Sequence, residues 1–191
     1  MGIISRSKQS LKTVLKKFGF LRGFPKGEFV NVAQDFRIGL YPSVTISPKS
    51  IIDIDRNVEM RRYCNIIVED NAHLLIEKNV FFNNYCSVNC QERIRIGANT
   101  ILGEGVKLYD HNHKYSVIPK FEISKDQFTR SAIDIGSNCW IGSNVVVLKG
   151  VTIGDNVIVG ANCLIYKSIP HNSIVRSKSE VLINEITQGN A

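Results

Sequence analysis

Long apolar runs are missing from this sequence, and no stretch approaches the roughly 18 consecutive apolar residues that suggest a membrane span. The N-terminus also lacks the continuous apolar segment and small-residue cleavage site of a secretory signal. The five cysteines contain no Cys-x-x-Cys pair, so the spacing of a thiolate metal site is absent. We therefore expect a cytoplasmic protein with reduced thiols and no bound metal.

Acidic residues are also missing at the start of the chain. No Asp or Glu precedes Glu28, whereas seven Lys and Arg residues do. Because the whole chain has 24 basic and 17 acidic residues, the part after this segment is electrically neutral and the formal charge of +7 belongs to the N-terminus. Binding to nucleic-acid phosphates needs clustered positive charge, so the neutral body argues against a nucleic-acid partner.

The basic N-terminal segment has an amphipathic pattern. Four apolar residues at helical spacing alternate with lysines: Leu11, Val14, Leu15 and Phe18. This pattern predicts a short basic helix over residues 5–22. Two interpretations remain open, a cap that packs on the folded body and a peripheral contact with an anionic membrane surface.

Residues 135–169 repeat every six positions, and an aliphatic residue opens each repeat. Small or aliphatic residues recur four positions later, and Gly, Ser and Asn fill most of the places between. This period fits neither a helix nor a hairpin array, but it fits short parallel strands joined by tight turns, three per coil. The sequence therefore predicts an all-β parallel β-helix with stacked aliphatic side chains inside a triangular prism. The six residues that open the repeats are Ile135, Ile141, Val147, Ile153, Val159 and Ile165.

One segment breaks the repeat completely. Residues 109–132, "YDHNHKYSVIPKFEISKDQFTRSA", show no six-residue period, although shorter blocks in step with the repeat lie upstream. A solenoid can extrude such a segment without disturbing its stack, and long loops in compact domains are usually functional. We expect an extruded loop that carries part of a site.

The repeats, the extruded loop and the motif "YDHNHKY" together resemble the hexapeptide-repeat acyltransferases, in the branch that O-acetylates galactosides, maltose and bacterial surface polysaccharides. The resemblance implies a left-handed β-helix, a homotrimer, and acetyl-CoA as co-substrate in the groove between neighbouring prisms. It divides the chain into a leader (1–29), a β-helix (30–170) and a C-terminal tail (171–191).

The resemblance also implies roles for individual residues. His111 matches the catalytic histidine, a general base that removes the proton of a sugar hydroxyl so that it attacks the thioester directly. His113 is a candidate helper or a plain exposed residue, and Asp110 either caps a turn or orients an imidazole. The residues expected to meet acetyl-CoA are Trp140, Ser143, Ala161 and Lys167, and the acceptor is expected at Asn83 or, with a one-residue shift, Asn84.

The resulting prediction is an acetyl-CoA-dependent O-acetyltransferase acting on a sugar hydroxyl of a bacterial capsule, O-antigen or exopolysaccharide, or of its precursor. Alternatives are N-acetylation of a nucleotide-linked amino sugar, serine O-acetylation, a non-catalytic β-helix scaffold, and a γ-carbonic-anhydrase-like metalloenzyme. The last would draw ligands from His73, His111 and His113, but the His-x4-His spacing of that family is missing. Acceptor choice is expected to differ from the galactoside and maltose enzymes, which have an acid where this chain has Gln91.

Overall fold

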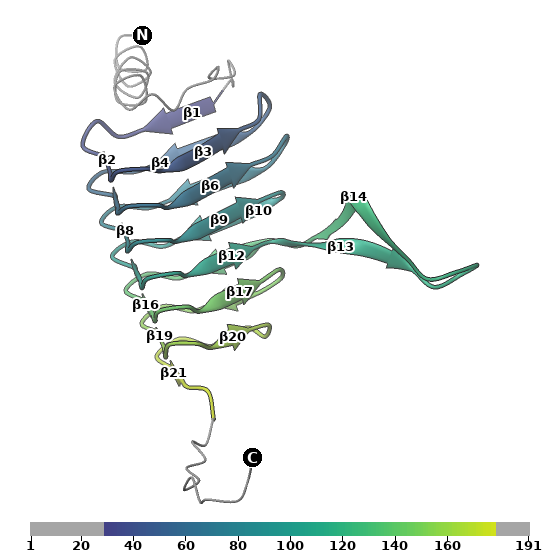
Figure 1. The fold of residues 1–191 in the computed structure, drawn as a ribbon. Coiled ribbons are helices and arrows are strands. Elements are labelled where there is room, and N and C mark those ends of the chain that lie inside the picture. Colours follow the sequence, from purple (N-terminus) through teal and green to yellow (C-terminus); the bar gives the residue numbers. More distant parts are fainter. Residues whose placement is uncertain (1–28, 179–191) are drawn as a thin grey trace, which may run out of the picture.

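The computed structural model describes residues 29–178, so the helix predicted over residues 5–22 lies outside the described part. The described chain winds as a prism of stacked coils (Figure 1). Three parallel sheets form its sides, and each complete coil contributes one strand to each sheet. The predicted left-handed parallel β-helix is therefore confirmed.

We call the three sides sheets A, B and C, in the order in which the chain passes through them. Sheet A contains β1 (Phe29–Val32), β4 (Ile51–Ile54), β7 (His73–Ile76), β10 (Arg93–Ile96), β15 (Ile133–Ile135) and β18 (Thr152–Ile153). Sheet B contains β2 (Arg37–Ile38), β5 (Glu59–Met60), β8 (Phe81–Phe82), β11 (Ile101–Leu102), β16 (Trp140–Ile141), β19 (Ile158–Val159) and β21 (Ile174–Val175). Sheet C contains β3 (Ser43–Ile46), β6 (Asn65–Val68), β9 (Ser87–Cys90), β12 (Lys107–Tyr109), β17 (Val146–Leu148) and β20 (Leu164–Ile165).

The interior of the prism is a continuous apolar column. The residues that open the six-residue repeats point inward, and Ile141 and Val147 are fully buried. Short strands alternate inward and outward side chains, so a period of six returns an aliphatic residue to the interior once per side. All five cysteines are free and buried within this column.

The first corner, between sheets A and B, is built on asparagine. In each coil after the first, one Asn adopts a left-handed backbone there, as at Asn79 (φ 61°) and Asn99 (φ 59°). Their side chains bond from coil to coil, since Asn79 donates to Asn99 at 2.8 Å and Asn99 donates to Asn138 at 3.0 Å. Asparagine tolerates this backbone better than other residues with a side chain, and the ladder satisfies its amide.

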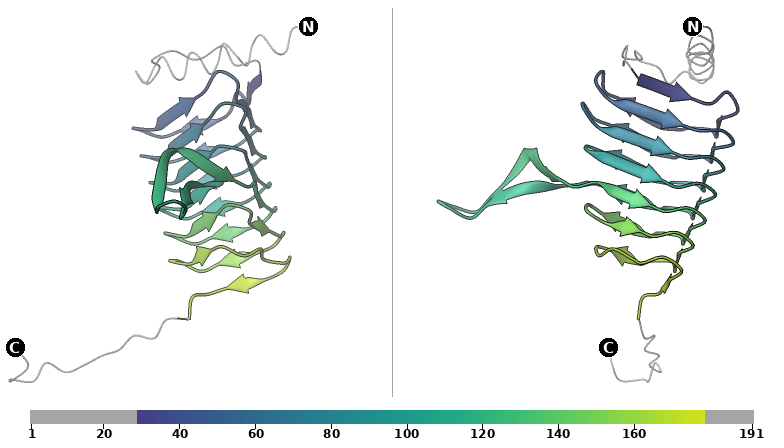
Figure 2. Two further views of the ribbon diagram at one scale, coloured as in Figure 1. Left: turned by 90° about the vertical axis from the view of Figure 1, so that its right-hand side faces the viewer. Right: turned by 180° about the vertical axis from the view of Figure 1, so that it is seen from behind.

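The extruded segment leaves the prism between β12 and β15, at the third corner, where sheet C gives way to sheet A. It forms a two-stranded antiparallel hairpin, β13 (His111–Ser116) and β14 (Glu122–Arg130), rather than an irregular loop. The hairpin projects away from the coils as an arm (Figures 1 and 2). The start of β13 and the end of β14 form the base of this arm, beside the prism. The motif "DHNH" begins at this base.

Candidate functional site

A buried carboxylate lies at the base of the hairpin. Asp110 is fully buried at the exit of β12, and its two oxygens accept hydrogen bonds from backbone N–H groups of the coil before it. The donors are Gln91 N, at 2.8 and 3.0 Å, and Glu92 N, at 2.8 Å. Asp110 thus caps the turn that follows β9. An N–H group can only donate, so both carboxylate oxygens act as acceptors here.

The same carboxylate contacts the predicted catalytic histidine. Nδ1 of His111 lies 3.2 Å from Oδ1 of Asp110, and 17% of the imidazole side chain is exposed. Because Oδ1 is an acceptor, we assign the ring proton to Nδ1, which leaves a free lone pair on Nε2. Asp110 therefore both caps a turn and orients an imidazole, the two roles that the sequence left as alternatives.

Two aromatic rings lie edge-on to the imidazole of His111. Tyr109 meets His111 edge-on with ring centroids 6.4 Å apart, and Phe128 of β14 does so at 5.3 Å with an interplanar angle of 90°. His113 lies 4.7 Å from the same Phe128 ring, and its Nδ1 is 3.0 Å from the carbonyl oxygen of Ser124. Sequence reasoning missed Phe128, which reaches the histidines only because the hairpin folds back.

A second hairpin residue fastens this cluster to the prism. Arg130 lies opposite His111 in the hairpin register, and its Nε donates to Oε1 of Gln91 at 3.2 Å. The guanidinium group is also 6.0 Å from the Phe128 ring. Gln91 therefore bonds to Asp110 through its backbone and to Arg130 through its side chain, so the base of the arm is fixed relative to His111.

The thiol of Cys90, which lies beside this cluster, is expected to be unreactive. Burial, followed by the charge of the nearby Asp110, raises the pKa of Cys90. Its sulfur donates to the carbonyl oxygen of His73 at 3.4 Å. A buried thiol that stays protonated is a poor nucleophile, so Cys90 is not a candidate nucleophile of this region.

Two of the residues expected to meet acetyl-CoA share the second corner, between sheets B and C. Ser143 and Ala161 occupy equivalent turns in successive coils, and the carbonyl of Ser143 accepts a hydrogen bond from Asn162 N at 2.8 Å. Trp140 starts β16 at the first corner with 56% of its surface exposed. Lys167 lies beyond β20 at the third corner, with Nζ 5.7 Å from the Tyr166 ring.

The predicted acceptor residues also lie on the second corner. Asn84 accepts a hydrogen bond from Arg62 N at 3.3 Å and donates to Glu104 at 3.4 Å, which places it in the turn column above Ser143. Asn83 accepts from Asn84 N at 2.9 Å. Within one chain, the structure thus brings Asn84, Ser143 and Ala161 onto one edge, whereas His111 lies on another, across the width of sheet C.

Neither a metal cluster nor a membrane-spanning helix is found in the described range. Over residues 29–178, no three His, Cys, Asp or Glu side chains are grouped to hold a metal ion, and His73, His111 and His113 form no such set. No helix in that same range is long and apolar enough to cross a membrane.

Comparisons with known proteins agree with the repeat and the fold. The bacterial transferase hexapeptide (six repeats) family matches residues 133–167. WbbJ of Escherichia coli (strain K12), a protein named for O-acetyl transfer in lipopolysaccharide biosynthesis, is 35% identical over 90 residues, or 44% of this chain and 46% of WbbJ. The chain thus spans about half the length of this curated relative.

Two solved structures are similar in fold. A mutant of AntD, an N-acyltransferase from Bacillus cereus bound to dTDP-4-amino-4,6-dideoxyglucose and coenzyme A, is 18% identical with a TM-score of 0.60, covering 85% of this chain and 82% of AntD. The polysialic acid O-acetyltransferase OatWY is 21% identical with a TM-score of 0.53, covering 84% and 89%. The chain therefore carries the hexapeptide repeat of bacterial transferases, wound into a left-handed β-helix.

Proposed function

We propose that the protein is an acetyl-CoA-dependent O-acetyltransferase that acts on a sugar hydroxyl, in a bacterial surface polysaccharide or its precursor. The observation that carries this proposal is the pair of Asp110 and His111 at the base of the extruded hairpin, with Nδ1 bound to the carboxylate and Nε2 left as a base. The names of the similar proteins support it, since they include O-acetyl transfer to surface glycans and a coenzyme A complex.

The proton transfers follow from this pair. Nε2 of His111 takes the proton of the acceptor hydroxyl while the oxygen attacks the acetyl carbonyl, and the imidazolium then returns the proton to the departing thiolate sulfur. Asp110 stabilises the imidazolium and keeps the proton on Nδ1 throughout. The developing negative charge on the carbonyl oxygen needs a hydrogen-bond donor, for which the Ser143 hydroxyl is the candidate. General-base help of this kind contributes about 10²–10⁴-fold.

The second corner fits an extended thioester substrate. Ser143 and Ala161 present small side chains in one column, next to the glycines Gly142 and Gly160. A Cβ at Gly142 would come within 2.7 Å of the backbone of Ala161, so the turns stack closely. With such small side chains, little bulk projects from this corner of the prism. The exposed ring of Trp140 would be covered by such a ligand or by a second copy. We assign Ser143 and Ala161 to acetyl-CoA on this basis, and we assign Trp140 and Lys167, which lie at the other two corners, on the family resemblance alone.

The active unit is proposed to be a homotrimer. His111 lies on the third corner and the acetyl-CoA edge on the second, so one chain does not place the base beside the thioester. Two neighbouring prisms would do so, with the hairpin base of one copy facing the second corner of the next. Asn83 or Asn84 would then bind the acceptor sugar in the same groove. The reaction would take place in the cytoplasm, where acetyl-CoA is available.

The test is transfer of a radiolabelled acetyl group from acetyl-CoA to a panel of surface glycans and nucleotide-linked sugars. We expect label in a glycan that mild alkali releases, because esters hydrolyse under conditions that leave amides intact. Alkali-stable label would instead indicate N-acetylation. A scaffold would transfer nothing, and coenzyme A would not raise its melting temperature.

A further inference from the structure

The second corner carries three stacked tyrosines in the N-terminal coils. The ring centroids of Tyr41 and Tyr63 are 5.2 Å apart with an interplanar angle of 12°, and those of Tyr63 and Tyr85 are 5.0 Å apart at 3°. The three side chains are 59%, 46% and 54% exposed. These residues, called here the tyrosine ladder, form a stack of rings along the prism axis, in which neighbouring rings cover each other's faces and the ring edges and hydroxyls face outward.

The backbone beneath the ladder is one that tyrosine disfavours. Tyr41, Tyr63 and Tyr85 have φ values of 57°, 58° and 61°, in the left-handed region. The nine other non-glycine residues with positive φ in the described range are all asparagine. A bulky side chain in this conformation is costly, and the same fold satisfies the equivalent positions with asparagine elsewhere. Backbone preference therefore does not explain the tyrosines, and two explanations remain, the stacking of the rings on one another and the contacts that their exposed edges and hydroxyls make.

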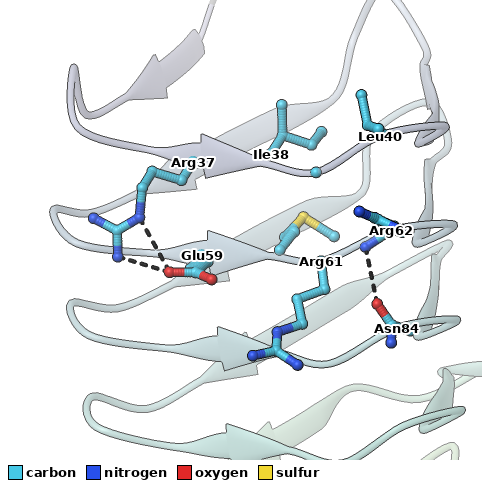
Figure 3. A pocket seen from close by; sticks show the side chains of 9 residues that line it. Arg37, Ile38, Leu40, Glu59, Arg61, Arg62 and Asn84 are labelled. Carbon is cyan, nitrogen blue, oxygen red and sulfur yellow. Dashed lines mark hydrogen bonds and ion pairs between the residues drawn. The ribbon is translucent and has the colours of Figure 1, made fainter.

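Positive charge lies beside the ladder. A surface pocket of about 560 Å³ is lined by Arg37, Leu40, Arg61, Arg62 and Asn84, among others (Figure 3). Arg37 is paired with Glu59 at 2.9 Å, which neutralises it. Arg61 and Arg62 are exposed, and neither forms an ion pair with a residue of the described range. The Arg61 guanidinium stands over the Phe81 ring at 5.1 Å. The pocket thus offers two uncompensated guanidinium groups next to an aromatic strip.

We propose that the tyrosine ladder and the pocket of Arg61 and Arg62 bind an anionic polysaccharide chain. The exposed ring edges can contact the C–H groups of sugar rings, the phenolic hydroxyls can hydrogen-bond to sugar hydroxyls, and guanidinium groups pair with carboxylates or phosphates on the chain. The ladder spans roughly 10 Å between its outer ring centroids, so it accommodates successive sugar units rather than one. A contact with an apolar protein surface would leave the two guanidinium groups unpaired, which is costly.

This inference rests on the proposed function, because it defines the chemical class of the acceptor. Asn84, a predicted acceptor residue, lines the pocket and directly precedes Tyr85 in the turn. The column continues through Glu104 to Ser143, on the edge assigned to acetyl-CoA. A chain lying along this corner would have its modified unit near Asn84, and its flanking units would lie on the ladder.

The test measures binding alone, by isothermal titration of the full chain without acetyl-CoA. The probes are oligomers of polysialic acid and polygalacturonate, with dextran as the neutral control. We expect binding of an anionic probe and none of dextran. Tyr63→Asn gives position 63 the residue that this backbone favours while removing the central ring, so it should fold well and bind about tenfold more weakly. Tyr63→Phe keeps the ring but lacks the hydroxyl, so its affinity should lie between those of wild type and Tyr63→Asn, and Arg62→Gln should bind more weakly with a smaller salt dependence.

Three results would overturn the inference: no binding of either anionic probe at low salt, equal binding of dextran, or unchanged affinity in Tyr63→Asn. A changed sedimentation coefficient in that variant, with affinity intact, would show that the ladder contacts a second copy instead. Because acetyl-CoA is absent, ladder binding and acetyl transfer fail independently, so a negative result in one assay does not decide the other.

Discussion

Replacing Asp110 with Asn should reverse the hydrogen bonding of the His111 imidazole, the proposed general base, with little change in shape. In the native site, Oδ2 accepts from Gln91 N at 3.0 Å and from Glu92 N at 2.8 Å. The asparagine amide oxygen keeps those bonds if it takes this position. Its NH₂ group then replaces Oδ1, which lies 3.2 Å from Nδ1 of His111. An NH₂ group donates, so Nδ1 must become the acceptor and the ring proton moves to Nε2.

The expected fall in kcat follows from the proposed role of Nε2 of His111. With its lone pair protonated, His111 no longer acts as a base, and kcat should fall by about 10²–10⁴-fold, as for loss of the imidazole itself. The stability cost should be smaller, about 1–3 kcal/mol, because the 2.8 Å bond from Gln91 N to Oδ1 loses its acceptor in a buried site. A folded but nearly inactive enzyme is therefore expected, and adding His111→Ala to it should cost little more.

Two assays measure the protonation of the His111 ring and the turnover separately. Nitrogen NMR of the labelled ring reports which nitrogen of His111 carries the proton, and acetyl transfer reports kcat. Asp155 is a control of the same residue types, since its Oδ2 lies 3.4 Å from Nδ1 of His171 on an exposed corner away from the hairpin, where that Nδ1 accepts from Asp155 N at 2.8 Å. Asp155→Asn should leave kcat unchanged. Near-native turnover in folded Asp110→Asn, or a ring proton that stays on Nδ1, would refute the reasoning.

Three further predictions concern the fold and the assembly. Burial raises the pKa of Cys90 and Cys139, so both thiols should stay protonated and resist alkylation at pH 8 until guanidinium unfolds the chain; rapid labelling of folded protein would contradict this. Asn99→Ala should lower the free energy of unfolding by about 1–3 kcal/mol in denaturant titrations, and Asn99→Gly, which tolerates the left-handed backbone, by less; equal losses would show that the backbone contributes nothing. Mixed trimers of His111→Ala and Ala161→Trp chains should regain activity that neither variant has alone, and inactive mixtures would argue against a site shared between copies.

The sequence predicted the prism because a period of six leaves few alternatives. Ile141 and Val147 had to share an interior once the turns were placed, and both are fully buried. The sequence contains a pattern for the tyrosine ladder that the six-residue repeat does not reveal. Tyr41, Tyr63 and Tyr85 recur every 22 positions, which is the length of one N-terminal coil. That spacing indicates stacking only when the coil length is known.

The surroundings of the His111 imidazole were less accessible to sequence reasoning. Phe128 and Arg130 come many residues after "DHNH" and carry no six-residue period, so only the antiparallel pairing of β13 with β14 returns them to His111. The two bonds of Gln91 depend likewise on which coil lies beside the hairpin. Contacts between turns of different coils are set by register, which no local motif encodes.

The proposed chemistry depends most on the imidazole of His111, and single-turnover acetyl transfer by His111→Ala tests it most directly. Coenzyme A affinity and melting temperature, measured on the same preparation, show whether the variant is folded and loaded. We predict unchanged affinity and a transfer rate at least about 10²-fold below wild type. A folded, loaded variant that transfers acetyl groups at the wild-type rate would contradict this account.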